Sequence, residues 1–172
     1  LFDKRTPLQK EWEKLEVQEQ RFLQKRSEKR ESILNQKLGE KIPPKLQKTL
    51  DTAFAKAFAG KMNAVVAITG AIDIVADAEK AYCIYNGRPE MSSITGTGCQ
   101  LSALTAAFVT ANQEQPLEAA AAAVCAMGLA GEKAYARLSE LDGNATYRNY
   151  IIDAIYCMNG EALEAGAKFE VR

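Results

Sequence analysis

The character of the sequence changes near Gly60, and this change limits the folds that the chain can adopt. Residues 1–61 contain 15 of the 22 Lys and Arg residues but 9 of the 22 Asp and Glu residues, so their net charge is +6. Residues 62–172 carry the opposite charge, −6, and are rich in apolar and small residues. Two stretches this unlike predict two segments of different origin, 1–61 and 62–172.

The first segment has the pattern of charged helices. Thr6-Pro7 is typical of a helix start, because proline fits the first helical position. Pro43-Pro44 ends this helix and begins a second one. In the second helix an apolar residue recurs every four positions, at Leu46, Leu50, Phe54 and Phe58. We expect residues 6–58 to form a basic helical hairpin that makes few contacts with the remainder of the chain.

The second segment has the pattern of short strands beside long helices. The β-branched, apolar run Ala64–Ile68 predicts a buried strand. Two more strands are expected at 72–74 and 82–84, joined by the polar turn Asp77–Lys80. The other expected elements are a strand at 91–94, a helix from Cys99, an alanine-rich helix over 117–138, a helix over 147–158 and a strand over 167–171. This mixture predicts an α/β layered fold.

One motif in this segment can carry chemistry, Thr95-Gly96-Thr97-Gly98-Cys99, between an expected strand and an expected helix. Its glycines let backbone amides approach an anion, and the helix start adds unpaired N–H groups. The motif could therefore hold a phosphate, or the negative charge that builds up during phosphoryl transfer. The motif lacks the Gly-Lys-Ser/Thr of a Walker A loop. An ordinary strand-to-helix turn is the alternative reading.

Other residues leave alternatives open. Cys99 at a helix start is either a reactive thiol or a small packing residue, whereas Cys83, Cys125 and Cys157 are expected to be buried. Thr69 ends a strand, where it faces a ligand or caps its own turn. The acidic residues of the expected hairpin, Asp73 and Asp77, are explained by a solvated strand edge. The chain has no histidine and no Cys-x-x-Cys pair, and we assign no metal ligand.

The order of these motifs is similar to that in hydroxyethylthiazole kinases. The resemblance covers residues 62–172, about two thirds of the chain, and corresponds to the C-terminal half of the family. It rests on four stretches at matching spacing, namely residues 64–70, 72–77, 85–87 and 95–99. It implies a partial ribokinase-like fold, a layered sheet with flanking helices. It also implies transfer of the γ-phosphate of ATP, with Mg²⁺, to the primary hydroxyl of 4-methyl-5-(2-hydroxyethyl)thiazole, in thiamine biosynthesis or salvage.

The resemblance also assigns roles to residues. Thr69 would contact ATP, and Gly96 would contact the thiazole near its reacting hydroxyl. Gly96, Thr97 and Gly98 would form the anion hole. Cys99 occupies the catalytic position, where most ribokinase-like enzymes have an aspartate base. A neutral thiol is a poor base, so we expect catalysis to rely mainly on positioning and charge stabilisation.

The first segment departs from this family. Nothing in residues 1–61 matches the N-terminal kinase half, which should supply most of the thiazole pocket, an arginine for ATP and acidic residues near Mg²⁺. These residues instead resemble the N-terminal helical region of EcsC-family proteins, on the cues Glu11–Leu15, Leu34–Leu38 and Ile42–Asp51. The chain is therefore interpreted as a fusion or chimera of two partial domains.

Three functions are compatible with these features. The first is the thiazole kinase or its remnant, a homo-oligomer that the family resemblance makes a trimer. The second is a non-enzymatic interaction protein whose basic helices bind a partner or an anionic membrane surface. The third is a different ribokinase-like kinase, which Cys99 in place of aspartate disfavours. Neither a nucleic-acid motif nor a transmembrane run is present. Free thiols and a polar N-terminus favour the cytoplasm.

Overall fold

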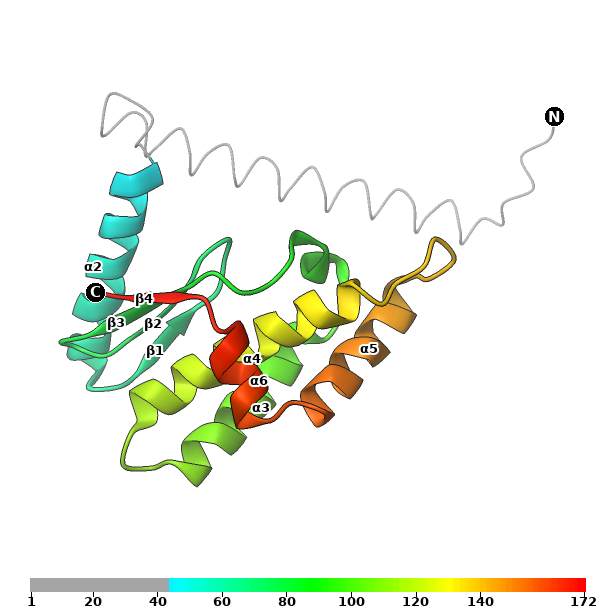
Figure 1. Ribbon diagram of the computed structural model, residues 1–172. Helices are drawn as coiled ribbons and strands as arrows, with labels where there is room; N and C mark the ends of the chain where they lie inside the picture. Colours follow the sequence, from blue (N-terminus) through cyan, green and yellow to red (C-terminus); the bar gives the residue numbers. More distant parts are fainter. Residues whose placement is uncertain (1–43) are drawn as a thin grey trace, which may run out of the picture. The chain divides into compact units, whose positions relative to one another are not determined.

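The computed structural model describes residues 44–172, with side chains from Lys48 onward, and Lys48–Arg172 forms one compact unit (Figure 1). The expected helix over residues 6–43 and most of the EcsC-like cues lie outside the described residues. The elements, in chain order, are α2 Pro44–Met62, β1 Val66–Ile68, β2 Asp73–Ala76, β3 Ala81–Ile84, the 3₁₀ helix η1 Pro89–Ser93, α3 Thr97–Ala111, α4 Pro116–Tyr135, α5 Asn144–Tyr156, α6 Gly160–Gly166 and β4 Phe169–Val171.

The strands of the described unit form a four-stranded antiparallel sheet in the order β1-β2-β3-β4. The hairpin between β2 and β3 turns at Asp77, whose carboxylate accepts hydrogen bonds from the N–H groups of Glu79 and Lys80, at 2.8 Å and 2.6 Å. These bonds keep the carboxylate ionised and lower the pKa of Asp77. The sequence prediction of this hairpin is confirmed, and the Asp77 side chain stabilises the turn of the hairpin.

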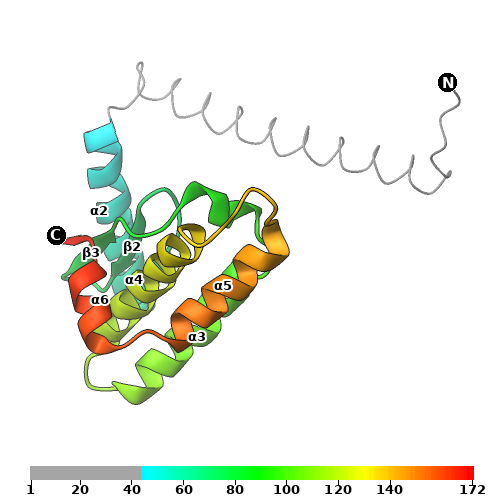
Figure 2. The same ribbon diagram turned by 45° about the vertical axis from the view of Figure 1, so that its right-hand side comes forward.

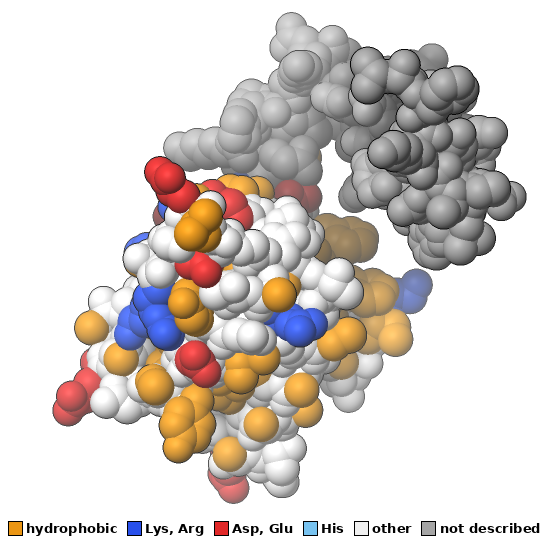
Figure 3. Space-filling model, turned by 90° about the vertical axis from the view of Figure 1, so that its right-hand side faces the viewer, with side chains coloured by type: hydrophobic (Ala, Val, Ile, Leu, Met, Phe, Trp, Pro, Cys, Tyr) orange, Lys and Arg blue, Asp and Glu red, His pale blue; other side chains and the backbone are white. Residues whose placement is uncertain are grey.

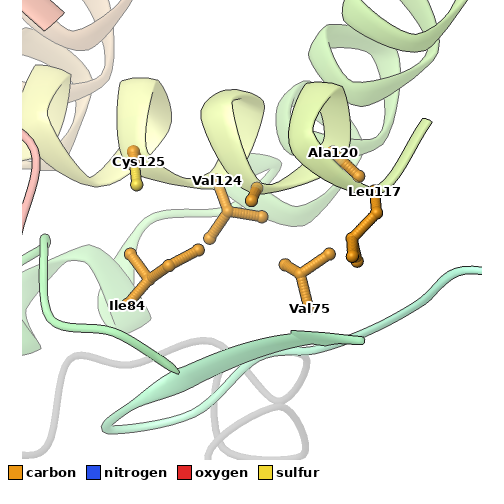
Figure 4. Close-up of a cluster of buried hydrophobic side chains, with 7 residues drawn as sticks. Val75, Ile84, Leu117, Ala120, Val124 and Cys125 are labelled. Atoms are coloured by element: carbon orange, nitrogen blue, oxygen red, sulfur yellow. The ribbon is translucent and has the colours of Figure 1, made fainter. Parts of the chain in front are cut away.

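Each face of the sheet packs against a helix, because alternate side chains of a strand point to opposite faces. Val75 and Ile84 face α4, and Figure 4 shows Leu117 and Val124 of that helix directed toward them. On the other face, Ile74, Ala76, Ala81 and Cys83 are covered by Ala55 of α2. The predicted α/β layered fold is confirmed.

Helix α4 lies at the centre of the helical layer. It contacts the sheet on one side and α3, α5 and α6 on others, as the turned view of Figure 2 shows. Fourteen of its residues are buried, and most of them are alanine or glycine. Small side chains let all these neighbours approach closely. The prediction of an alanine-rich helix that is buried on most sides is therefore confirmed.

Helix α2 differs from the sequence prediction. Residues 48–62 pack on the sheet through Thr52, Ala55 and Ala59, so the expectation that residues 6–58 make few contacts with it is wrong for this stretch. The large residues Leu50, Phe54 and Phe58 of the every-fourth-residue repeat are 42–63% exposed. The covered side of the helix is formed instead by Ala55 and Ala59, which are almost fully buried.

The segment after β3 also differs. Residues 91–94 were predicted to form a strand, but Pro89–Ser93 is a 3₁₀ helix. The hydroxyls of Ser92 and Ser93 donate to the carbonyls of Pro89 and Glu90, at 2.7 Å and 2.8 Å. Such side-chain bonds to the backbone compete with strand pairing. The short helix α6 was also missed, and its start is capped by the Asn159 side chain, which accepts from the Ala162 N–H.

Candidate functional site

A cleft of about 550 Å³ lies beyond the ends of two strands of the sheet. β1 and β3 run in the same direction because each is antiparallel to β2, so the C-terminal ends of both strands lie beside the cleft. The β1–β2 turn, the loop after β3, the start of α3 and the middle of α4 form the walls. The polar side chains that line the cleft are Thr69, Asp73, Tyr85, Asn86, Arg88, Ser92 and Thr97.

Of the predicted site residues, the structure brings Thr69, Thr97 and Gly98 together in this cleft. Gly96 precedes them at the N-terminal boundary of α3. Cys99 is exposed and is not among the lining residues. Thr69 belongs to the turn after β1, so the two motifs that were singled out separately in the sequence share one cavity.

The first turn of α3 presents backbone donors to this space. Gly96 has φ +97°, a left-handed conformation that glycine adopts readily, and no side chain caps the helix. The first carbonyl bond of the helix is from Gln100 N–H to Gly96 C=O, at 3.0 Å, so the N–H groups of Thr97, Gly98 and Cys99 precede the helical ladder. A Cβ added at Gly96 or Gly98 would meet no atom within 4 Å. The backbone there is open to a ligand.

The β1–β2 turn holds a half-buried carboxylate. Asp73 accepts a hydrogen bond of 2.8 Å from the Gly70 N–H, which fixes the turn after Thr69. Burial nevertheless raises the pKa of Asp73, and the bond from Gly70 only partly offsets this. The sequence interpretation of Asp73 as a residue of a solvated strand edge is therefore wrong. Its side chain lies in the cleft because β2 turns it to the α4 face of the sheet.

We expect Asp73→Asn to raise the thermal unfolding midpoint at pH 7. Asparagine keeps the acceptor for the Gly70 N–H and removes a buried charge. Because the folded-state pKa of Asp73 is raised, the ionised carboxylate costs stability above that pKa. The advantage of the variant should therefore shrink as the pH falls through the folded pKa. Asp153→Asn, at an exposed ion pair with Arg137, is the control. An advantage that is constant from pH 7 to pH 3 would contradict this account.

Asn86 connects the cleft to the C-terminal elements and was not identified from the sequence beyond its turn. Its side chain is buried, donates to the Gly166 carbonyl at 2.9 Å and accepts from the Lys168 N–H at 2.8 Å. The Glu132 carboxylate accepts from the Gly87 N–H at 2.9 Å and from the Lys168 ammonium at 2.7 Å. Burial alone would raise the pKa of Glu132, but these donors lower it.

Arg88 is the one lining residue with a positive charge among the residues that the structure describes. Its guanidinium pairs with Glu90 at 2.9 Å and lies 4.1 Å from the centroid of the Tyr135 ring. These partners hold the arginine at the cleft wall, and its side chain is 40% exposed. It remains accessible to an anionic ligand.

The cysteines are free thiols with different surroundings. Cys83 and Cys125 are buried, as predicted, and burial raises the pKa of Cys125 to about 11. Cys157 is exposed, so the prediction that it is buried is wrong. It is the C-cap residue that follows Tyr156, the last residue of α5.

The described residues do not build a metal centre of their own. They contain no group of three or more His, Cys, Asp or Glu side chains placed to bind an ion. Asp73 is the one carboxylate that lines the cleft within this part of the chain. Mg²⁺ usually keeps several waters and binds one or two carboxylates together with substrate phosphates. Asp73 fits that limited role.

Comparison with known proteins identifies the family. The model of the hydroxyethylthiazole kinase family matches residues 40–161, a range that includes α2. A hydroxyethylthiazole kinase of Clostridium acetobutylicum is 58% identical over 124 residues, which are 71% of this chain and 45% of the relative. One from Zea mays is 40% identical over 118 residues, 69% of this chain and 41% of the relative.

A solved structure agrees with these sequence matches. The hydroxyethylthiazole kinase protein of Pyrococcus horikoshii OT3 superposes with a TM-score of 0.66 and 32% identity, covering 73% of this chain and 48% of that chain. The chain thus spans less than half the length of these relatives. The match extends over most of the described unit, including the cleft. This chain belongs to the hydroxyethylthiazole kinase family.

Proposed function

We propose that this chain contributes the phosphate-handling part of an ATP-dependent hydroxyethylthiazole kinase. The reaction transfers the γ-phosphate of ATP to the primary hydroxyl of 4-methyl-5-(2-hydroxyethyl)thiazole, a step of thiamine biosynthesis or salvage. One observation carries the proposal: the unpaired amides at the start of α3 and Thr69 border the same cleft. Family membership supplies the class of reaction.

In this proposal each group has a separate task. Thr69 contacts ATP, and Gly96 lies near the reacting hydroxyl of the thiazole. The amides of Gly96, Thr97 and Gly98 form an anion hole that stabilises the charge that develops during phosphoryl transfer. Cys99 occupies the position of the base, but a neutral thiol removes a proton poorly. Positioning and charge stabilisation are therefore expected to supply most of the rate enhancement.

Mg²⁺ and the assembly belong to the same proposal. The ion would accompany the phosphates of ATP, with Asp73 as a ligand or as the acceptor of a bound water. A homo-oligomer, trimeric in the family, is supported by the family resemblance. A cytoplasmic location is supported by the free thiols. None of the described helices has the length and apolar character needed to cross a bilayer. The alternative, a basic segment that binds a partner or a membrane surface, concerns residues that lie mostly outside the described range.

Titration with inorganic phosphate and then ATP, followed by amide NMR, tests the proposal. We expect the signals of Gly96 to Cys99 to shift, because backbone donors at a helix start bind anions without help from another domain. Gly98→Val should weaken phosphate binding by about tenfold or more, since its side chain would occupy the approach to these amides. The fold should tolerate the valine because the space beside Gly98 is open.

Cys99→Ser is the matched control for this titration. It changes a neighbouring side chain and leaves the backbone donors in place, so phosphate affinity should stay within about twofold of the unsubstituted chain. Signals of Gly96 to Cys99 that do not move on titration, in a chain that remains folded, would contradict the proposed anion hole.

A further inference from the structure

The outer edge of β1 has no strand beside it within the described residues. β1 is the first strand in the sheet order, and its pairing with β2 sets Val66 opposite Ala76, Ala67 opposite Val75 and Ile68 opposite Ile74. An unpaired edge presents a row of free N–H and C=O groups that can bind another strand.

The hydrogen bonds of the sheet identify which residue presents those groups. Ala81 of β3 exchanges both backbone bonds with Arg172, at 2.9 Å and 2.8 Å, so its backbone points toward β4. Ala81 therefore makes no backbone bond with Ala76, the residue opposite it on β2. The N–H and C=O of Ala76 point away from β3, toward β1. Val66 and Ile68 therefore bond to β2. Ala67, between them, directs its N–H and C=O to the free edge.

The two edges of the sheet differ in character. At the other edge, β4 carries Glu170, whose carboxylate binds the Lys48 ammonium at 2.7 Å and the Arg172 guanidinium at 2.9 Å. Charges of this kind protect an edge strand from pairing with another chain. β1 has the sequence Val-Ala-Ile, without charge, proline or bulge. Its edge is three residues long and carries no charge, proline or bulge that would block strand addition.

Large apolar side chains are also exposed on β1 and on α2. Ile68 is 36% exposed on the face that α2 covers elsewhere, and Ala67 is exposed on the opposite face. Helix α2 adds a row of large apolar residues at four-residue spacing, Leu50, Phe54, Phe58 and Met62, which are 42–63% exposed. By contrast, on the face shown in Figure 3 the apolar side chains are interspersed with polar and charged ones. The β1 edge and this row are therefore both suited to burial.

The comparisons indicate what would cover this surface. The chain covers 45% of the C. acetobutylicum kinase and 48% of the P. horikoshii structure, so more than half of each relative has no counterpart in the match. Thr69 follows β1 and lines the cleft, so a strand added beside β1 would also border the cleft. We propose that the free edge of β1, at Ala67, binds a strand from a polypeptide equivalent to the part of a hydroxyethylthiazole kinase that this chain does not cover.

The partner is thus an α/β polypeptide that pairs with Ala67 and covers Ile68 and the apolar row of α2. The pairing rests on the family assignment and on the open edge, and it does not depend on the proposed catalytic roles. A probe for it is available in the C. acetobutylicum relative, which is 58% identical. The probe is the portion of that kinase outside the 124 matched residues, co-expressed with the full chain.

Native mass spectrometry of the co-expressed proteins should show a one-to-one complex or a multiple of it. In the complex, hydrogen exchange of the Ala67 amide should slow by about tenfold or more, because that N–H becomes a strand donor. Ala67→Pro removes this donor at a position where an edge strand tolerates proline, and it should weaken the complex by about tenfold. Ala67→Val keeps the donor and should bind like the unsubstituted chain.

Three results would overturn the inference. They are the absence of a complex while both polypeptides are folded, a complex in which exchange at Ala67 is unchanged, and an Ala67 amide already protected in the chain alone. If Ala67→Pro itself unfolds, the exchange measurement on the unsubstituted chain still decides. Turnover with ATP is recorded separately: the chain alone should phosphorylate the thiazole very slowly or not at all. A complex without turnover would count against the proposed function and leave the pairing intact.

Discussion

Replacing Gly128 by valine should lower the free energy of unfolding by about 3 kcal/mol. A Cβ at this position would lie 2.7 Å from the carbonyl carbon and the Cβ of Asn86, and 2.8 Å from its oxygen. Two of these three atoms belong to the backbone of the loop after β3, which cannot rotate away as the end of a long side chain can. Valine adds two methyl groups to the same conflict. The loop or the helix must move, and the cleft between them must deform.

Two substitutions with smaller expected costs provide the comparison in urea unfolding curves. Gly131→Ala meets the Met91 side chain, which can adopt another rotamer, so its cost should be smaller than that at Gly128. Gly160→Ala meets nothing within 4 Å and should be nearly neutral. A Gly128→Val protein that unfolds within about 0.5 kcal/mol of the unsubstituted chain would show that the loop after β3 rearranges freely.

Asn86→Ala should lower the free energy of unfolding by about 3 kcal/mol as well, for a different reason. The amide of Asn86 satisfies the Gly166 carbonyl and the Lys168 N–H, and it donates to Glu132 at 3.3 Å. Truncation leaves the Gly166 carbonyl and the Lys168 N–H without their partner in a part-buried position, where an unpaired polar group costs more than the bond itself contributed. The link from the cleft to α6 and β4 is lost.

Asn144→Ala provides the comparison, because Asn144 is exposed and makes a single side-chain bond to the Ser93 carbonyl, at 3.1 Å. Its cost should stay below about 1 kcal/mol. Hydrogen exchange at the Lys168 amide gives a local measurement: it should accelerate in Asn86→Ala and stay unchanged in Asn144→Ala. Equal costs for the two substitutions would mean that the Asn86 network contributes little.

The fold could be predicted where the pattern of residues reflects local geometry. The run before Thr69, the polar turn at Asp77 and the alanine-rich stretch each predicted the type of their element, because period, turn residues and composition are local properties. The prediction that the strand before Thr69 is buried is wrong, since Ala67 and Ile68 are exposed. The face of α2 could not be predicted in this way. Phe54 and Phe58 belong to the apolar repeat, yet Ala55 and Ala59 are the buried residues, because tertiary packing decides which side of a helix is covered.

Some residues of the candidate site could likewise be predicted from the sequence, and others could not. The glycines at 96 and 98 were detectable because a motif before a helix signals exposed amides in the sequence itself. Asn86 gave only a turn signal, since its partners lie 46 and 80 residues away in the chain. Asp73 was read as solvated because nothing local shows that the strand turns it toward α4. Residues whose surroundings come from distant segments need the structure.

The many buried alanine and glycine residues of α4 limit the substitutions that this protein can accept. A helix with close neighbours on so many sides has no direction in which a side chain can grow, so enlargement at most of its positions forces a neighbour outward. In a saturation mutagenesis experiment selected for soluble protein, the buried alanine and glycine positions of α4 should tolerate alanine, glycine and serine and little else. Those positions would carry none of the proposed chemical groups. Sequence drift in this protein would therefore be slowest along α4, and accommodation of new ligands would fall to the loops at the cleft.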